Sequence, residues 1–425
     1  MKIRLTLLLV VFSLVARPQD TIKVLNYNLL NYGNYTSYCT SANNNHENKD
    51  ILLRTIIGFE LPDIFTVNEI SRYAFYHDRV LDMVMNADGR NYYQRASIPN
   101  LAGSDLVNML YFNTNKMSLK SHRVVQSDVR DIDLFTLYFK TNSLQSGDTV
   151  FLNCLVAHLK AGNTSADAIK RAEMTANAIN FLKNNQLAGN YLFMGDLNTY
   201  TSTENCYQNL TGISALEFRF FDPVNKPGDW NNNSAFADWH TQSVSASGNG
   251  CQASGGMDDR FDHILATAEI MNGSRGLKYI VDSYHAVGQD GLHFNKSIND
   301  LPQNNLVPTD VLNALASNSD HLPVRLDLLL DANGPGNIAK QSVFSNVGVY
   351  IPDQSQALFF VTSAIAKNAT ISLISITGLT IRTEDHTLAA GRNEIKMDIS
   401  ELKPGVYIIR LSDLQGQMSS VKLVK

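Results

Sequence analysis

Three short motifs bring together residue types that can do acid–base and metal chemistry. They are Gly195-Asp196-Leu197-Asn198, Arg260-Phe261-Asp262-His263 and Ser319-Asp320-His321, and each stands at the edge of an apolar run. Carboxylates bind hard divalent cations and take protons from water, and histidines exchange protons near neutral pH. These are the side chains that metal-assisted cleavage of a phosphate ester needs.

Asp196 and Asn198 follow the apolar run 191–194. Residues two apart in an extended chain point to the same side, so we expect both side chains to face one site. There Asp196 can take a proton from water, and the amide of Asn198 can donate to a phosphoryl oxygen. The alternative is an Asx turn that only ends the strand.

Asp320 and His321 precede the apolar run 324–330. Neighbouring residues of an extended chain face opposite ways, so a shared task requires a bend, which Pro323 favours. Asp262 opens another apolar run, where an unpaired charge is costly and a histidine partner removes the cost. We therefore expect Asp262 to orient His321; the alternative is a surface carboxylate at a strand end.

Glu69 and Asn28 each end an apolar run, and the rim of a sheet is a common place for ligands. Mg²⁺ prefers a few oxygen ligands and waters, which Glu69, Asn28 and Asp320 can supply. His158 ends a further run and has a pKa suited to protonating a leaving oxygen. Taken singly, each is more often an ordinary strand end or a structural histidine, so the ordered series carries the prediction.

The elements that must position these residues alternate between strands and helices. Helical spacing occurs at 50–58, 76–85 and, most clearly, 165–184. Strands are expected at 22–25, 64–67, 109–112, 134–139, 150–156, 191–194, 264–266 and 324–330. This mixed order predicts a layered α/β core.

The chain changes character after the turn formers of 331–337, where a linker is expected. Short apolar runs without intervening helices predict a small β-sandwich. Its strands are expected at 343–349, 357–362, 369–376, 379–383, 393–399, 405–411 and 419–424. With 425 residues, the chain is therefore expected to hold one large and one small domain.

The first residues predict export. A basic start, Lys2 and Arg4, precedes an apolar run at 5–15, as in a secretory signal peptide. That run is shorter than the roughly 20 residues that span a membrane, and no later run is long enough. The four cysteines can therefore meet an oxidising setting, in which three pairings are open. Cys206 with Cys251 is the favoured pair because both lie in irregular segments between the two strongest motifs.

Taken together, the motifs resemble the endonuclease/exonuclease/phosphatase superfamily, the DNase I-like fold. The resemblance rests on Tyr27-Asn28, Asn68-Glu69, Ala157-His158-Leu159, Gly195-Asp196-Leu197-Asn198, Phe261-Asp262-His263 and Ser319-Asp320-His321. It implies a four-layered α/β sandwich with a divalent-metal site at one rim. Mg²⁺ is the implied ion, with Ca²⁺ or Mn²⁺ as alternatives, bound by Glu69 with Asn28 and Asp320.

The same resemblance implies the catalytic roles. Asp196 and Asn198 would align the attacking water and the transition state. His321, held by Asp262, and His158 would contact the phosphate and help the leaving oxygen depart. The family pairs the first histidine with an acid that has no evident counterpart in this sequence.

The last 80-odd residues resemble the C-terminal sorting domain of the type IX secretion system of Bacteroidetes. The resemblance lies in the runs 369–378, 391–393, 402–411 and 421–425, although the usual Pro-Asn-Pro start is missing. We therefore expect a signal peptide at 1–19, a catalytic domain at 20–330, a linker at 331–340 and a sorting domain at 341–425. The implied location is outside the cell or on its surface, and the secretion machinery is an implied partner.

The leading hypothesis is a secreted, monomeric, metal-dependent endonuclease that cleaves nucleic acid. A formal net charge of -5 offers no evident basic face for phosphates, which counts modestly against nucleic acid. The alternatives are a phosphatase or phospholipase-like esterase on the same fold and a non-catalytic surface protein. Substrate choice is expected to lie in the loop 222–259, where Trp230 and Trp239 either stack on bases or pack inside the loop.

Overall fold

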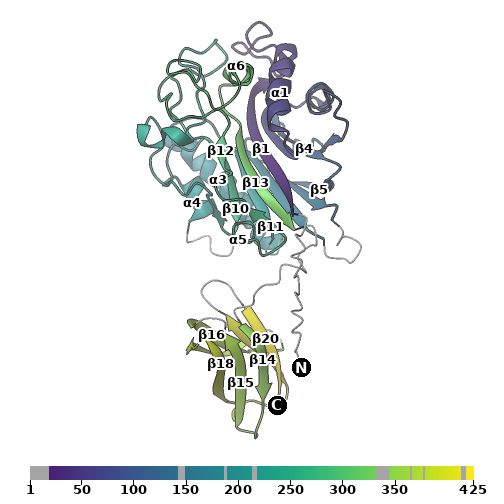
Figure 1. The fold of residues 1–425 in the computed structure, drawn as a ribbon, viewed down its shortest axis with the longest axis vertical. Helices are drawn as coiled ribbons and strands as arrows, with labels where there is room; N and C mark the ends of the chain where they lie inside the picture. The colour runs from purple at the N-terminus through teal and green to yellow at the C-terminus, as the bar shows by residue number, and fades with distance from the viewer. Residues whose placement is uncertain are drawn as a thin grey trace, which may run out of the picture. The chain divides into compact units, whose positions relative to one another are not determined.

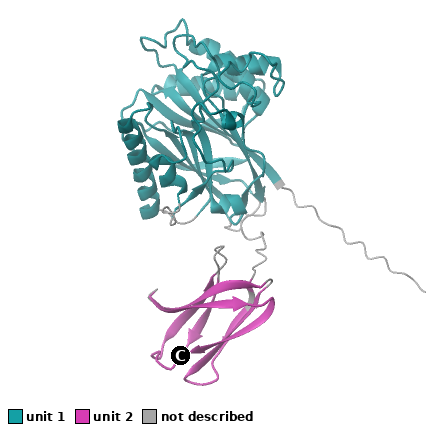
Figure 2. Ribbon diagram, turned by 90° about the vertical axis from the view of Figure 1, so that its left-hand side faces the viewer, with its two compact units in different colours: residues 1–338 teal, residues 339–425 magenta. Residues whose placement is uncertain are grey.

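The computed structural model describes most of the chain. The described residues are 19–141, 149–185, 189–212, 218–331, 344–363, 366–376, 379–412 and 418–425. Two compact units, 1–338 and 339–425, are shown in different colours in Figure 2. The predicted signal peptide lies outside the described residues except for Gln19, and the predicted linker except for Asp331. No described helix is both long and apolar enough to cross a membrane.

The first unit contains a seven-stranded sheet in the order β11-β13-β1-β2-β4-β3, with β12 also paired to β13. Its strands are β1 (Gln19–Tyr32), β2 (Ile64–Ser71), β3 (Tyr93–Arg95), β4 (Leu106–Asn113), β11 (Leu277–Tyr279), β12 (His285–Ala286) and β13 (Val324–Asp331). Only β1 and β2 run parallel to each other, and β13 runs antiparallel beside β1 (Figure 1). The alternating burial along β13 shows that one face of this strand meets the core.

A six-stranded sheet follows the order β5-β6-β7-β8-β10-β9. Its strands are β5 (Met117–Gln126), β6 (Ile132–Phe139), β7 (Phe151–His158), β8 (Tyr191–Asp196), β9 (Phe220–Phe221) and β10 (Asp262–Thr267). All residues of β8 and β10 are buried, which explains why both read as continuous apolar runs. Side chains of β7, β8 and β10 pack with those of β1, β2 and β13 in one core between the two sheets.

Helices cover the outer faces of both sheets. The helices are α1 (His46–Glu60), α2 (Ala74–Val80) with a π-helical turn (Leu81–Met85), α3 (Ser165–Asn185), α4 (Asn205–Thr211), α5 (Ala268–Asn272) and α6 (Thr309–Asn318). Side chains of α1, the π-helical turn and α6 join the first core. Those of α3 and α4 form a second core against the six-stranded sheet. The predicted four-layered α/β sandwich is confirmed.

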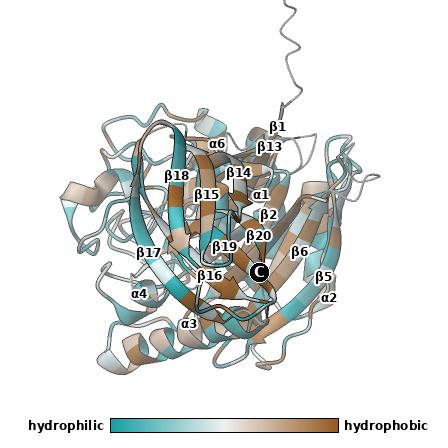
Figure 3. Cartoon of the chain, turned by 90° about the horizontal axis from the view of Figure 1, so that it is seen from below, coloured by the Kyte–Doolittle hydropathy of each residue, from teal (hydrophilic) through white to brown (hydrophobic). Residues whose placement is uncertain are grey.

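The second unit is the predicted β-sandwich. Its strands are β14 (Phe344–Tyr350), β15 (Gln356–Ser363), β16 (Lys367–Ser375), β17 (Thr380–Leu388), β18 (Gly391–Asp398), β19 (Val406–Ser412) and β20 (Met418–Val424). They form two sheets, β14-β15-β18 and β17-β16-β19-β20, around one apolar core. The hydropathy colours of Figure 3 show the apolar run of β15, along which buried and half-buried residues alternate.

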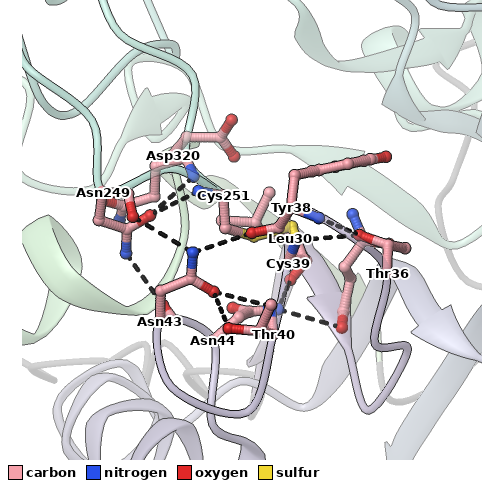
Figure 4. The surroundings of a disulfide bond; sticks show 12 residues. Leu30, Thr36, Tyr38, Cys39, Thr40, Asn43, Asn44, Asn249, Cys251 and Asp320 are labelled. Carbon is pink, nitrogen blue, oxygen red and sulfur yellow. Dashed lines mark hydrogen bonds between the residues drawn. A yellow bond between two sulfur atoms is a disulfide. The ribbon is translucent and has the colours of Figure 1, made fainter.

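The disulfide pairing differs from the expectation. Cys39 bonds to Cys251 (Figure 4), while Cys154 and Cys206 are free and buried. Cys206 lies in α4 and packs into the core beneath α3, whereas Cys251 packs with Cys39 and Leu30 in a separate small cluster. The predicted Cys206–Cys251 pair was therefore wrong because the fold places these two residues in different packed clusters.

Candidate functional site

Strand pairing gathers the predicted site residues at one rim of the two sheets. Asn28 of β1 pairs with Asn68, the neighbour of Glu69, in β2. His158 and Asp262 both pair with Asp196, from the two sides of β8. Asp320 and His321 come directly before β13, whose first residue pairs with Asn26. The ends of strands far apart in the sequence thus meet in one place.

Two irregularities turn Asn28 and Glu69 toward this place. The register of β1 and β2 shifts between Asn28 and Tyr32, where Leu30 and Asn31 have positive φ. The register of β2 and β4 shifts at Glu69, whose φ is 57°. Bulges re-aim side chains beside functional sites, and a positive φ at a glutamate is a strained conformation that neighbouring contacts must hold.

Gly195 allows β8 to lie close to β7 at the end of the two strands. Its φ is 139°, and a Cβ atom there would lie 1.8 Å from the carbonyl oxygen of Ala157 in β7. Any side chain would push the two parallel strands apart at this point. Gly195 therefore lets Asp196 and His158, the last residues of their strands, stand side by side.

Asn28 is the centre of the resulting cluster. Its Nδ2 donates to Glu69 Oε1 at 3.1 Å and to Asp196 Oδ2 at 2.9 Å. His158 Nε2 lies 3.7 Å from the same Glu69 oxygen and 3.5 Å from the same Asp196 oxygen. The second oxygen of Glu69 accepts from the backbone N–H of Asn31 at 3.0 Å. Two carboxylates, an amide and an imidazole thus converge on one small volume.

Asp262 and His321 form the tightest pair of the site. His321 Nδ1 lies 2.6 Å from Asp262 Oδ2, which also accepts from the hydroxyl of Thr241 at 2.7 Å. Asp262 is fully buried, so its charge depends on these partners. The other ring nitrogen, Nε2, faces Asp196 Oδ2 at 3.7 Å and the amide nitrogen of Gln242 at 2.8 Å.

Asp320 and His321 share this rim, as their proposed tasks require. Asp320 Oδ1 lies 3.9 Å from His321 Nε2 and has no hydrogen-bond partner among the described residues. Asp320 Oδ2 accepts from Gln242 Nε2 at 3.2 Å and from the backbone N–H of Ala253 at 3.0 Å. One buried oxygen of Asp320 is therefore available to a further ligand.

Asn198 is placed differently from the expectation. The chain is not extended there, because Asn198 has φ 49° and its N–H donates to Asp196 Oδ1 at 3.0 Å. This is the Asx turn that was the alternative interpretation. The side-chain amide of Asn198 donates to the carbonyl oxygen of Leu159 at 3.4 Å, and no hydrogen bond joins it to the other site residues that the structure describes.

Burial and charge shift the protonation of the site. Burial raises the pKa of Asp196 to about 7, with Asp262 and Glu69 adding to the shift and His321 opposing it. Burial works against the imidazolium of His321, but Asp262, Asp196 and Asp320 outweigh it, and the pKa rises well above its usual value. Burial, Arg130 and His321 together hold the pKa of His158 well below its usual value.

These shifts give the two histidines different states at neutral pH. His158 is a neutral ring, whereas His321 favours the imidazolium, which carries hydrogens on both nitrogens. Neutral His321 can accept from the Gln242 amide N–H, but the imidazolium cannot. Protonation of His321 therefore requires the Gln242 amide to turn its oxygen toward the ring.

The donor set fits a divalent cation. One ligand atom each from Glu69, His158 and Asp196 lies within 4.8 Å of the others. Carboxylate oxygens with the free oxygen of Asp320 suit a hard cation such as Mg²⁺, Ca²⁺ or Mn²⁺. A cation would also relieve the crowding of negative charge that contributes to the high pKa of Asp196.

Two site residues were missed in the sequence. Gln242 bridges His321 and Asp320 from an irregular loop, where one amide among many gives no signal. Lys49 of α1 is buried, and its ammonium donates to the carbonyl oxygen of Leu30 at 3.0 Å. Burial lowers the pKa of Lys49 to about 7, against the opposing charges of Asp320 and Glu69. A lysine on the buried face of α1 was the available clue.

Trp230 of the 222–259 loop is not free to stack on bases. Trp230 is fully buried, packs edge-on against Tyr207 and donates its indole N–H to the carbonyl oxygen of Lys226 at 2.8 Å. Trp239 is partly buried and packs against the main core. For Trp230, packing, the second of the two alternatives, is the observed arrangement.

Three solved structures illustrate what this chain is similar to. An endonuclease/exonuclease/phosphatase family protein of Bacteroides thetaiotaomicron is 14% identical, with 74% of this chain and 97% of that chain covered and a TM-score of 0.43. The human Nocturnin catalytic domain with bound sulfate is 16% identical, with 73% and 97% covered and a TM-score of 0.44. A mannosyl-6-phosphatase of Bacteroides thetaiotaomicron is 15% identical, with 72% and 99% covered and a TM-score of 0.41. Identities this low do not indicate an activity.

No curated protein matches this chain significantly. Residues 352–425 match the family model described as a secretion system C-terminal sorting domain. The match covers β15 to β20, most of the second unit. The chain therefore carries a sorting domain that directs export by type IX secretion to the cell surface or the surrounding medium.

Proposed function

We propose that this protein is an exported, divalent-metal-dependent phosphodiesterase that hydrolyses nucleic acid. One observation carries the proposal. The buried Asp262–His321 pair, with 2.6 Å between Oδ2 and Nδ1, stands at the same rim as the cluster of Glu69, His158 and Asp196. Acid–base groups and a candidate metal site within a few ångströms are the parts that hydrolysis of a phosphate ester requires.

Asp196 is the proposed acceptor of the proton from the attacking water. Burial raises the pKa of this carboxylate in the metal-free protein, and a bound cation would lower it again and favour the ionised form that accepts a proton. Its Oδ1 is held by the N–H of Asn198 at 3.0 Å, which fixes the carboxylate in one orientation. The Asn198 backbone thus contributes a positioning contact through the Asx turn.

His321 is the proposed cationic contact to the phosphate. Asp262 fixes the ring through Nδ1 and leaves Nε2 facing Asp196 and Asn28, the side from which substrate would approach. An imidazolium there can donate to a phosphoryl oxygen and give its proton to the leaving oxygen. Neutral His158 can accept or donate one hydrogen bond on the opposite side of the same cluster.

Glu69, with Asp320 nearby and Asp196 and His158 in reach, is the proposed ligand set for the cation. Asn28 would join it only with its amide turned so that Oδ1 takes the place of Nδ2. A bound divalent ion would neutralise charge that develops on the phosphate and lower the pKa of a coordinated water. The protein's own part is to hold these groups in place before substrate arrives. The backbone N–H of Asn31 and the amide of Asn28 do so for Glu69.

A small phosphate ester is the second candidate substrate, and two observations favour it. Burial of Trp230 removes one surface on which a base could stack. Asp258 and Asp259 lie in the same loop, and Asp259 is close enough to His321 for their charges to interact. Negative charge beside the site repels a polyanion more than a small ester. A non-catalytic surface protein is the third candidate, and the convergence of Glu69, His158 and Asp196 with His321 at one rim counts against it.

A substrate panel separates these proposals. The purified chain would be incubated with supercoiled plasmid, single-stranded RNA and a phosphate monoester, each with Mg²⁺, Ca²⁺ or Mn²⁺ and again with a chelator. We expect chelator-sensitive cleavage of nucleic acid. Phosphate release from the monoester with intact plasmid and RNA would favour the second candidate, and inactivity on every substrate would favour the third.

A further inference from the structure

The Cys39–Cys251 disulfide joins two segments that flank the site. Cys39 lies in the segment between β1 and α1, and Cys251 lies 212 residues later in the loop before β10. Figure 4 shows that the two segments also exchange hydrogen bonds. Asn43 Nδ2 donates to the carbonyl oxygen of Asn249 at 3.2 Å, and Asn249 Nδ2 donates to that of Asn43 at 3.0 Å.

The segment on the Cys39 side leads directly to the proposed metal ligands. Leu30, which packs against the disulfide, donates its N–H to Asn28 Oδ1 at 2.9 Å. The next residue, Asn31, donates its N–H to Glu69 Oε2 at 3.0 Å. The Asn44 side chain donates to the carbonyl oxygen of Leu30 at 2.9 Å. The strained backbone that holds Asn28 and Glu69 thus rests against Cys39.

The segment on the Cys251 side holds Asp320. The N–H of Ala253 donates to Asp320 Oδ2 at 3.0 Å, and Gln252 Nε2 donates to the carbonyl oxygen of Ser319 at 3.1 Å. Cys251 is the only buried residue between positions 248 and 255, all of which the structure describes. Three glycines of this stretch, Gly248, Gly250 and Gly255, have positive φ. The stretch therefore has little apolar packing of its own, and the disulfide holds it together with a few hydrogen bonds.

We propose that the Cys39–Cys251 disulfide is a positioning element of the cation site and that the site reaches full metal affinity only after the bond forms. This inference rests on the proposed function, because it concerns the same ligands. The disulfide ties the Asn28–Glu69 side of the rim to the Asp320 side. Without it, the Ala253 N–H is free to leave Asp320, and the Leu30–Asn31 turn loses a contact that holds its N–H groups on Asn28 and Glu69. The pairing of β1 with β13 and the Ser319 hydroxyl on the Asn28 carbonyl still join the two sides, so the effect is on the orientation of the ligands.

Export determines whether the Cys39–Cys251 bond can form. Thiols stay reduced in the cytoplasm, and disulfides form outside it. Exchange with an oxidised disulfide-bearing partner would form the Cys39–Cys251 bond and reduce that partner to two thiols. A chain that carries a secretion sorting domain would therefore acquire its full metal affinity on leaving the cell, and the cytoplasmic precursor would be held in a weakly active form.

The test measures metal binding apart from activity. Mn²⁺ dissociation constants would be obtained from the electron paramagnetic resonance signal of free Mn²⁺ for the wild-type full chain and for Cys39→Ser/Cys251→Ser. The matched control is Cys154→Ala, which removes a free, buried thiol of β7. We expect the dissociation constant of the double variant to rise at least about tenfold, as for other lost supports of metal ligands, and that of the control to stay unchanged.

A merely structural disulfide would give a different pattern. The double variant would then melt at a lower temperature but, while folded by circular dichroism, bind Mn²⁺ as tightly as wild type, which would overturn the inference. Excess Mn²⁺ should restore most of the kcat of the double variant. If that variant does not fold, reduction of the folded wild-type chain, with the two released thiols trapped by alkylation, gives the same comparison. A wild-type chain that binds no Mn²⁺ would instead refute the metal site of the proposed function.

Discussion

Asp262→Asn is the substitution that most sharply separates catalysis from folding. It keeps the shape of the side chain and removes the charge that faces His321 Nδ1 at 2.6 Å. Asp262 Oδ1 has no hydrogen-bond partner among the described residues, so an amide nitrogen placed there would be buried and unpaired. If the amide turned instead, its nitrogen would face the His321 ring and favour the wrong tautomer.

The size of the effect follows from these contacts. A hydrogen bond to a charged group contributes about 1.5–3 kcal/mol, and each 1.4 kcal/mol is a factor of ten in rate, so the lost bond alone costs roughly 10- to 100-fold. Loss of the imidazolium and of the correct tautomer adds to this, and the same change beside a catalytic histidine of serine proteases costs about 10⁴ in kcat. We expect kcat to fall by about 10² to 10⁴ with KM changed little.

The assay is steady-state hydrolysis at saturating metal, with urea unfolding measured on the same samples. Asp133→Asn is the matched control, because Asp133 forms another buried Asp–His pair, 2.8 Å from His122, outside the site. The control should keep kcat within about threefold of wild type. A folded Asp262→Asn chain with wild-type kcat, or an equal loss in both variants, would refute the assigned role of Asp262.

Three further predictions follow from other parts of the structure. Glu69→Gln should raise the Mg²⁺ concentration for half-maximal activity about tenfold or more, and an unchanged Mg²⁺ titration would exclude Glu69 as a ligand. Burial alone would raise the pKa of Asp222, but Arg260 outweighs it and lowers that pKa to about 2. The pair therefore stabilises the fold by roughly 2 kcal/mol above pH 4, and this stabilisation is lost as the pH falls toward 2. Urea unfolding should show Asp222→Asn less stable by about 3–5 kcal/mol at pH 7, with the difference from wild type smaller at pH 3; a constant difference would contradict the pKa. Cys39→Ser/Cys251→Ser should lower the free energy of unfolding by about 2–5 kcal/mol, because the bond closes a loop of 212 residues, and unchanged urea unfolding would contradict a stabilising bond.

The layered fold was predictable because its strands are apolar runs with polar ends. The run 191–194 became the buried strand β8, and the run 324–330 became β13. Neighbouring β-strands end at a common rim, so the order of Asp196, Asp262 and His321 in the sequence already indicated one site. The small sandwich was predictable because its strands are short apolar runs that follow one another closely with no helix between them.

The remaining features depend on contacts that no local pattern contains. The partner of Cys251 lies 212 residues away, and only the meeting of two loops selects Cys39 over Cys206. Asn198 has a left-handed backbone conformation instead of the predicted extended one, because its N–H donates to the Asp196 carboxylate two residues earlier. Gln242 entered the site through a loop whose path is set by tertiary packing. The helix α6 was also missed, because its ten residues carry only a short apolar stripe.

The measurement that tests the central claim most directly is nicking of supercoiled plasmid by the wild-type chain and by Asp196→Ala/His321→Ala, with Mg²⁺ and again with chelator. The account predicts nicking by wild type that needs Mg²⁺ and is absent from the folded double variant. Equal nicking by both chains, or nicking that persists with chelator, would contradict the claim that this metal-binding cluster cleaves phosphodiesters.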